Sequence, residues 1–167
     1  KIGVIGDLHL KDNLSYADYL EDRRVTEKEA VLNFIVESFK DCDTVILMGD
    51  NLHSRTNSPH TIKEFTNFIE RFEGKRLVIL KGNHEAFGDG RSAIDFLKEI
   101  KKRNWIIVTN NTEAFDNLSF CPFFTKSELG TNDNEAGAEE ILKRLKPGNI
   151  LFHHHAVADC IMGSGFP

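Results

Sequence analysis

The segment TVILMGD at residues 44–50 decides the fold, because it joins a run that is apolar after its first residue to a glycine and a carboxylate. Such a run is typical of a strand buried on both faces of a parallel sheet, and Gly49-Asp50 marks the point where the strand becomes a loop. Two other segments have the same design, IGVIGD at residues 2–7 and LVILKGNH at residues 77–84. We therefore predict a parallel sheet whose strands end in polar loops.

Helices are expected between these strands. Residues 25–39 place apolar side chains at helical spacing among Glu and Lys, which predicts a helix covering the sheet. The expected apolar face of this helix comprises Ala30, Val31, Phe34, Ile35 and Phe39. A second helix is predicted from Pro59, and a third from a capping box of Ser92 and Asp95 through Lys102. Right-handed crossovers would bring the carboxyl ends of the strands to one edge, where ligands of open α/β sheets collect.

The second half of the chain predicts a different kind of sheet. Residues 105–109 predict a fourth strand, but residues 114–124 contain a turn between two short apolar runs, which favours a hairpin. A polar stretch near residue 132 precedes a helix that ends near Pro147, and residues 150–152 form a last strand. A mixed sheet is therefore expected after the parallel one.

Composition limits the classes of protein that this chain can represent. Its 167 residues, 40% of them hydrophobic and 13 of them Phe, suit one domain with a sizeable core. The net charge of -5 predicts no general affinity for polyanions, so any binding of DNA must be local or assisted. Three cysteines without CxxC spacing and no apolar run of membrane-spanning length favour a cytoplasmic protein.

Polar side chains gather at the predicted strand ends. They are Asp7, His9, Asp50, Asn83, His84 and the histidines of residues 153–155. Each alone fits an ordinary turn or surface position, since Gly-Asp and Gly-Asn are common in turns, but the whole set in this order predicts a site. Carboxylate, imidazole and amide donors together hold divalent ions, and a carboxylate can bridge two of them. Asp50 is the expected bridge.

Three strand-end motifs, Gly6-Asp7-Leu8-His9, Gly49-Asp50-Asn51-Leu52-His53 and Gly82-Asn83-His84-Glu85, resemble the leading motifs of the calcineurin-like metallophosphoesterases. The resemblance implies an α/β fold, a four-layer αββα sandwich with mostly parallel or mixed sheets. It also implies two divalent metal ions. Mn2+ is expected by analogy, with Mg2+, Fe2+ and Zn2+ as alternatives that nitrogen and oxygen ligands do not separate.

The same resemblance assigns roles to the strand-end residues. Asp7 and His9 would bind one metal ion, and Asp50 would bridge both. Asn83 would bind the second ion through its amide oxygen. His84 would contact the scissile phosphate, and would protonate the leaving oxygen or stabilise the transition state. The glutamate that follows His84 would orient it.

A further metal ligand is expected after the last strand. The family has a histidine after a strand of four hydrophobic or small residues, and this register selects His154, with His153 as the second choice. Because side chains alternate along a strand, His153 and His155 should share one face and His154 should point to the other. Only one of these faces can meet the metals.

The chain departs from the family pattern near its end. The family closes its site with a Gly-His-x-His motif downstream, and residues 1–167 contain no such motif. We therefore expect one metallophosphoesterase (nuclease) domain over residues 1–167, truncated before the closing motif. The alternative is a degenerate member with weak metal binding.

The second motif narrows the resemblance. Many phosphatases of the family have Gly-Asp-x-x-Asp there, whereas this chain has His53, followed by Arg55 and by Ser58-Pro59 at a helix start. This pattern is similar to the SbcD-type DNA repair nucleases. By that resemblance His53 joins His84 as a catalytic residue, and Arg55 would bind the DNA substrate. The alternative for His53 is a loop residue that caps the following helix.

The SbcD-type resemblance also implies a function and partners. A DNA exonuclease or endonuclease acting in repair or recombination is expected, with DNA, an SbcC-type coiled-coil ATPase and a second copy of the chain as partners. These partners would supply the basic surface that the chain lacks. The alternatives are a general phosphatase or phosphodiesterase of the family, and a scaffold without turnover. The intact site argues against the scaffold, because clustered carboxylate and imidazole are costly to bury without metals.

Overall fold

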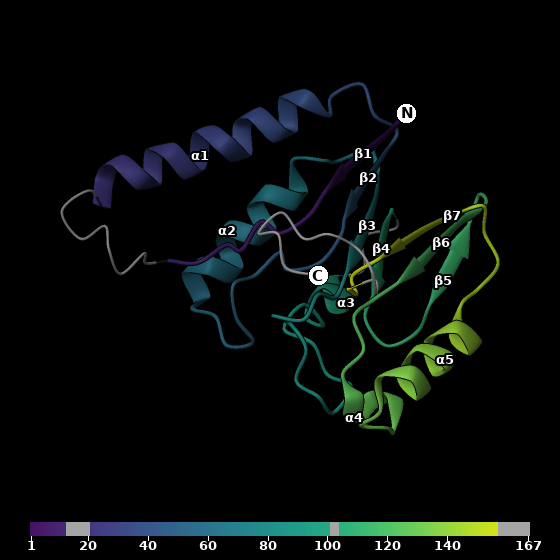
Figure 1. Cartoon of the computed structure of the whole chain (residues 1–167). Coiled ribbons are helices and arrows are strands. Elements are labelled where there is room, and N and C mark those ends of the chain that lie inside the picture. The colour runs from purple at the N-terminus through teal and green to yellow at the C-terminus, as the bar shows by residue number, and fades with distance from the viewer. Residues whose placement is uncertain (13–20, 101–103, 157–167) are drawn as a thin grey trace, which may run out of the picture.

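A four-stranded parallel sheet forms the centre of the protein (Figure 1). The computed structural model describes residues 1–12, 21–100 and 104–156. In sheet order, which is also chain order, the strands are β1 (Ile2–Ile5), β2 (Thr44–Leu47), β3 (Arg76–Leu80) and β4 (Trp105–Val108). All four match the predicted segments. Every residue of β2 is buried, as expected of a strand covered on both faces.

Two helices, α1 (Glu21–Ser38) and α2 (Pro59–Glu70), lie along one side of this sheet (Figure 1). α2 begins at Pro59, as predicted. Ser58 is its N-cap, and the Ser58 hydroxyl accepts a hydrogen bond from the Thr61 amide. Proline in the first turn is compatible with the helix, since it lacks only an amide that would have no partner there. The main hydrophobic core lies between these helices and the sheet, and its members include Val45, Leu47, Phe65, Phe68, Ile69 and Leu77.

The predicted apolar face of α1 is only partly right. Ile35 is buried, but Val31 is 55% exposed and Phe34 is 73% exposed. Leu32 is buried in their place. Two apolar stripes pass through Ile35, and both fit helical spacing. Packing on the sheet selects the stripe that contains Leu32 and leads to Phe39, which packs against the main core.

The third predicted helix is shorter than expected. Its capping contact is present, because the Asp95 carboxylate accepts a hydrogen bond of 2.6 Å from the Ser92 amide. The chain then turns without forming a helix until α3 (Leu97–Ile100), and Lys102 lies outside the described residues. An isolated bridge between Ala86 and Ser92 accounts for the late start, since it pairs this segment with the preceding loop.

A second sheet contains β5 (Glu113–Phe115), β6 (Leu118–Cys121) and β7 (Ile150–His153) in that order. β5 and β6 form the predicted antiparallel hairpin. Its turn residues, Asp116 and Asn117, have φ values of 49° and 64°, the left-handed conformation that tight hairpin turns require. β7 pairs with β6 in parallel, so the sheet is mixed, as predicted.

The two sheets pack face to face and complete a four-layer αββα arrangement. Their shared core contains Ile46, Val78, Leu80, Val108, Leu118 and Phe120. The predicted helix α5 (Asn134–Arg144) and the short α4 (Lys126–Leu129) lie beside the second sheet, away from α1 and α2 (Figure 1). The predicted fold class is confirmed. In the part of the chain that the structure describes, no helix is long and apolar enough to cross a membrane.

Asp12, in the loop after β1, contacts the start of α2. Its carboxylate accepts hydrogen bonds from the Ser58 hydroxyl and, at 2.6 Å, from the Thr61 hydroxyl. It also lies 2.9 Å from His60 Nδ1. The hydrogen bonds from Ser58 and Thr61 lower the pKa of Asp12 to about 2. The ionised carboxylate thus ties this loop to the helix start.

This contact predicts a loss of stability in acid. A carboxyl group whose pKa is lowered by folding stabilises the folded state above its unfolded pKa, here 3.8, and loses that contribution as the pH falls toward about 2. Asp12→Asn should therefore be less stable than the wild type near neutral pH, and the difference should shrink between about pH 4 and pH 2. Urea denaturation across this range measures the difference, and a value independent of pH would contradict the assignment.

Candidate metal centre

The loops after β1 and β2 run side by side at the carboxyl edge of the first sheet. Backbone hydrogen bonds join the His9 amide to the Asp50 carbonyl at 2.9 Å and the Asp7 amide to the Gly49 carbonyl at 3.2 Å. The parallel pairing of the strands thus continues into the loops. Two of the predicted motifs are held against each other by an extension of the sheet.

Three predicted metal ligands have left-handed backbone conformations. The φ angle is 56° at Asp7, 47° at His9 and 50° at Asp50. Such angles are uncommon outside glycine, although Asp and His adopt them more readily than most residues. Backbone strain of this kind concentrates at functional sites, where surrounding contacts hold it in place. Its recurrence in two adjoining loops distinguishes this edge from a set of ordinary turns.

Asp50 lies at the centre of the cluster, with 5% of its side chain exposed. Its Oδ2 atom is 3.8 Å from His9 Nε2 and 3.9 Å from His84 Nε2. Its Oδ1 atom is 3.5 Å from His154 Nε2 and accepts a hydrogen bond of 2.9 Å from the His84 amide. The two carboxylate oxygens therefore face different donors, an arrangement that suits a carboxylate bridging two ions.

The structure distinguishes the three histidines at the end of β7. His154 lies in the cluster, with Nδ1 2.8 Å from the Met48 carbonyl and Nε2 3.0 Å from Asn83 Oδ1. A carbonyl beside Nδ1 favours a proton there and leaves the Nε2 lone pair for a metal. His153 and His155 belong to neither group of candidate metal donors among the described residues. The position of His154 therefore suits its predicted role best.

Two groups of side chains in the described ranges have ligand atoms close enough to share an ion. Within each group these atoms lie within 4.8 Å of one another, and the groups are Asp7, Asp50 and His154, and His9, His53 and His84. The first group consists of residues predicted to bind metal. Its carboxylate and imidazole donors suit divalent ions such as Mn2+, Fe2+ or Zn2+. The residues present therefore fit the metal ions that the sequence implies.

The two predicted catalytic histidines lie together. His84 Nδ1 is 2.6 Å from the His53 carbonyl, and the two ring centroids are 5.6 Å apart. Burial, together with the charges of Lys11 and the neighbouring histidines, lowers the pKa of His53. The His53 ring therefore stays neutral to a lower pH than a free histidine would.

The alternative role for His53, capping α2, is wrong. The N-cap of that helix is Ser58, whose hydroxyl accepts the capping hydrogen bond. Arg55, predicted to bind the substrate, is exposed in the bend between these two residues. Helix capping therefore does not explain why His53 lies beside His84.

The buried Glu85 carboxylate holds two of the strand-end loops together. It accepts hydrogen bonds from the backbone amides of Asp50 at 3.0 Å, Gly82 at 2.7 Å and Leu52 at 2.9 Å. Burial raises the pKa of Glu85, although these hydrogen bonds act in the opposite direction. Sequence reasoning assigned Glu85 to orienting the His84 ring and missed this role. Its carboxylate fixes the backbone of the loops that carry the candidate ligands.

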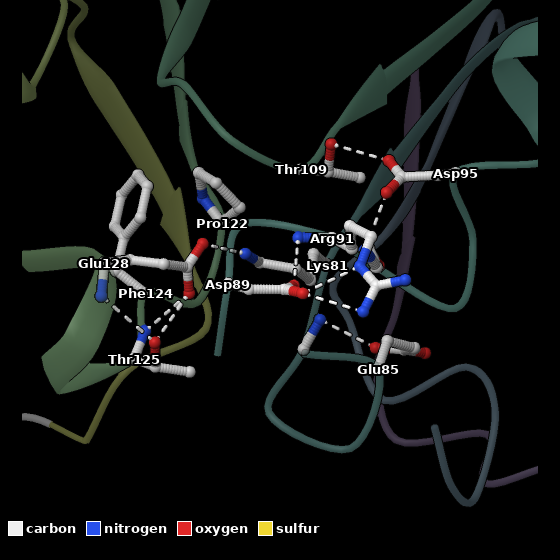
Figure 2. Close-up of polar contacts among 12 residues, drawn as sticks. Lys81, Glu85, Asp89, Arg91, Asp95, Thr109, Pro122, Phe124, Thr125 and Glu128 are labelled. Carbon is white, nitrogen blue, oxygen red and sulfur yellow. Dashed lines mark hydrogen bonds and ion pairs between the residues drawn. The ribbon is translucent and has the colours of Figure 1, made fainter. Parts of the chain in front are cut away.

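A buried ion pair supports the loop after β3 (Figure 2). Lys81, directly after that strand, is fully buried, and its Nζ donates to Glu128 of α4 at 2.6 Å. Burial alone would raise the pKa of Glu128, but hydrogen bonds from Lys81 and Thr125 outweigh it and lower the pKa. The helices of the second sheet are thereby tied to the residues next to Asn83. Sequence reasoning missed this pair. A lysine directly after an apolar strand could have indicated a buried cation that needs an acidic partner.

The protein is a layered αββα sandwich with carboxylate, imidazole and amide donors gathered at one sheet edge, an arrangement that can hold divalent ions. A model of the calcineurin-like phosphoesterase family matches residues 1–165, and the chain belongs to that family. The family is one of metal-dependent phosphoesterases, and the two donor groups at the sheet edge are of the kind that can hold divalent ions.

One similar solved structure is described as the crystal structure of Pseudomonas putida nuclease MPE. The two chains are 22% identical, the match covers 70% of this chain and 51% of that chain, and the TM-score is 0.46. This chain thus spans about half the length of that protein, and a likeness of this size has no bearing on function. No curated protein matches the chain.

Replacing Glu85 by Gln tests the support of the loops. One amide oxygen can still accept from two backbone N–H groups, but the amide NH2 must then face the third donor. A buried donor without an acceptor costs about 1–3 kcal/mol, so the free energy of unfolding should fall by that amount and Mn2+ affinity should fall with it. Urea denaturation and calorimetric titration measure the two quantities. Unchanged values for both would remove Glu85 from this role.

Gly82→Ala tests the close approach of the loops after β2 and β3. An added Cβ would lie 2.1 Å from Asp50 Oδ1 and 2.2 Å from the Asp50 amide nitrogen, too near for either to stay in place. The variant should bind Mn2+ at least about tenfold more weakly. Gly137→Ala in α5 is the matched control, because its Cβ would make only ordinary contacts at 3.5 and 3.8 Å. Equal Mn2+ affinities of the two variants in calorimetric titration would refute the prediction.

Proposed function

We propose that this chain is the DNA-cleaving subunit of an SbcD-type nuclease that acts in DNA repair or recombination. It would hydrolyse phosphodiester bonds, as an exonuclease or an endonuclease, with two divalent ions, and Mn2+ is the expected metal. The family supports metal-dependent hydrolysis of phosphoesters, and DNA as the substrate is the finer part of the proposal. The observation that supports it is the pairing of His53 with His84 next to Asp50.

A phosphodiester makes demands that two imidazoles can meet. Its leaving group is an alkoxide, which departs readily only when it receives a proton. Negative charge also develops on the phosphate oxygens and requires a nearby donor. His84 would deliver the proton, and His53, neutral because its pKa is lowered, would donate a hydrogen bond to a phosphate oxygen.

The metal ions would be held by the residues that follow the strands. Asp7 and His9 would hold one ion. Asn83 and His154 would hold the other, with the two oxygens of Asp50 facing both sets. Bound divalent ions lower the pKa of water and neutralise the charge that develops on phosphate. The fold would contribute by fixing the loops that carry these donor side chains.

The two ring nitrogens of His84 have different surroundings. Its Nδ1 atom faces the His53 carbonyl at 2.6 Å, an acceptor that keeps a proton on that nitrogen. Nε2, 3.9 Å from Asp50 Oδ2, is then the ring nitrogen that faces the centre of the cluster. Nε2 is thus the atom that would deliver a proton to the leaving oxygen.

Affinity for DNA would come from an assembly. The net charge of -5 gives the chain no general attraction for a phosphate backbone. An SbcC-type coiled-coil ATPase and a second copy of the chain would add basic surface around the site. Arg55, exposed after the second motif, would then bind the DNA backbone.

His84→Ala and Asp50→Ala test the division between chemistry and metal binding. His84→Ala should leave Mn2+ affinity almost unchanged while turnover falls by about 100-fold or more, the usual contribution of a general acid. Asp50→Ala should lose both, because it removes the bridge. Calorimetric titration and cleavage of labelled duplex DNA measure these effects. Full activity in His84→Ala would overturn the mechanism.

The choice of substrate is settled by the same assay. Wild-type protein with Mn2+ is offered duplex DNA, single-stranded DNA and a nitrophenyl phosphodiester. DNA cleavage that disappears in His84→Ala would support the nuclease. Cleavage of the small ester alone would favour a general phosphodiesterase, and no turnover with any divalent metal would favour a scaffold.

A further inference from the structure

Three imidazoles meet at the edge of the metal cluster. The ligand nitrogens of His9, His53 and His84 all lie within 4.8 Å of one another. The ring centroids are 4.7 Å apart for His9 and His84 and 5.6 Å apart for the other two pairs. This group contains no carboxylate, whereas the neighbouring group contains Asp7 and Asp50. Two donor sets of different chemistry therefore lie side by side.

His9 is within reach of both sets. Its Nε2 atom is 3.8 Å from Asp7 Oδ1 and 3.8 Å from Asp50 Oδ2. Its Nδ1 atom is buried and has no hydrogen-bond partner among the residues that the structure describes. A histidine that binds metal is normally fixed by a hydrogen bond from its other nitrogen. Among the described residues, no hydrogen bond to Nδ1 therefore holds the His9 ring to one set.

His84 offers one nitrogen to the imidazole set. Because its Nδ1 atom is engaged by the His53 carbonyl, the lone pair of the neutral ring is on Nε2. Two nitrogens bound at about 2.1 Å to a tetrahedral ion lie about 3.4 Å apart. Small side-chain rotations would therefore bring the three nitrogens into bonding range of one ion.

We propose that His9, His53 and His84 form an alternative, all-nitrogen site for Zn2+, and that filling this site inactivates the protein. Imidazole suits Zn2+, whereas Mn2+ and Mg2+ are better served by carboxylate, carbonyl and water. Zn2+ also binds a given set of donors more tightly than Mn2+ does. An ion in this site takes His9 away from the carboxylates and occupies the His84 nitrogen that carries the proton.

Metal identity then selects between two states of one cluster. Mn2+ occupies the oxygen-rich set and leaves His53 and His84 free to contact phosphate. Zn2+, which the oxygen-rich set can also hold, prefers the imidazole set and there withdraws both side chains. The inactivating effect rests on the proposed function, since it requires His84 to act on the substrate, but the binding site itself does not.

Metal titration of the purified chain tests the site without an assay of activity. Zn2+ and Mn2+ are titrated calorimetrically into the wild type and His53→Ala. Co2+ is the spectroscopic probe, because a tetrahedral nitrogen site gives it strong visible absorption and a six-coordinate oxygen-rich site gives it weak absorption. His53→Ala should lower Zn2+ affinity at least about tenfold, remove the strong Co2+ absorption and leave Mn2+ affinity unchanged.

Two further variants make the test specific. His60→Ala is the matched control, because His60 contacts Asp12 at the start of α2 and belongs to neither donor group. It should bind all three metals as the wild type does. Asp7→Asn should show the reverse preference, losing more affinity for Mn2+ than for Zn2+. Equal Zn2+ affinity in the wild type and His53→Ala, with circular dichroism showing both folded, would overturn the proposal.

Turnover separates failure of this site from failure of the proposed function. Zn2+ added to the Mn2+-loaded wild type should stop DNA cleavage, and removal of Zn2+ by a chelator followed by Mn2+ should restore it. Full turnover with Zn2+ bound would overturn the inactivating role. Absence of turnover with Mn2+ alone would reject the proposed function, while the titrations would still decide whether the imidazole site exists.

Discussion

The hydrogen bonds between the Glu85 carboxylate and three backbone amides are the constraint on which the site depends. They fix the loop after β2 to the loop after β3, so that Asp50 meets the donors that follow the next strand. The approach is close enough to leave Gly82 no room for a side chain. A buried carboxylate without such bonds would be unfavourable. The loops therefore stabilise the carboxylate, and the carboxylate in turn fixes the loops.

The sheet was the part of the structure most accessible from the sequence. Burial on both faces leaves little choice of residue, so the apolar runs that end in a polar loop located β1, β2 and β3. The sequence did not determine which face of α1 is buried, because two different faces fit the same helical spacing of apolar residues. Both Val31 and Leu32 fit a helical stripe through Ile35, and only packing on the sheet determines which of them is buried.

The candidate site, too, was predicted only in part from the sequence. The strand-end motifs identified the donors around Asp50, because parallel strands deliver their carboxyl ends to one edge. The contacts that position these donors escaped prediction. Glu85 reaches an amide 35 residues away, and Lys81 pairs with Glu128 of another layer. The partner of a charged side chain at such separations depends on the whole fold, and no local pattern contains it.

The left-handed backbone at Asp7, His9 and Asp50 has a consequence for how the protein changes under selection. Strain of this kind costs on the order of 1 kcal/mol per residue, and glycine would relieve it. A screen that rewards heat resistance alone would thus favour glycine at these three candidate ligand positions. At these three positions the residue that best stabilises the fold differs from the residue that can bind a metal ion, so descendants that no longer need the proposed site would be expected to replace them first.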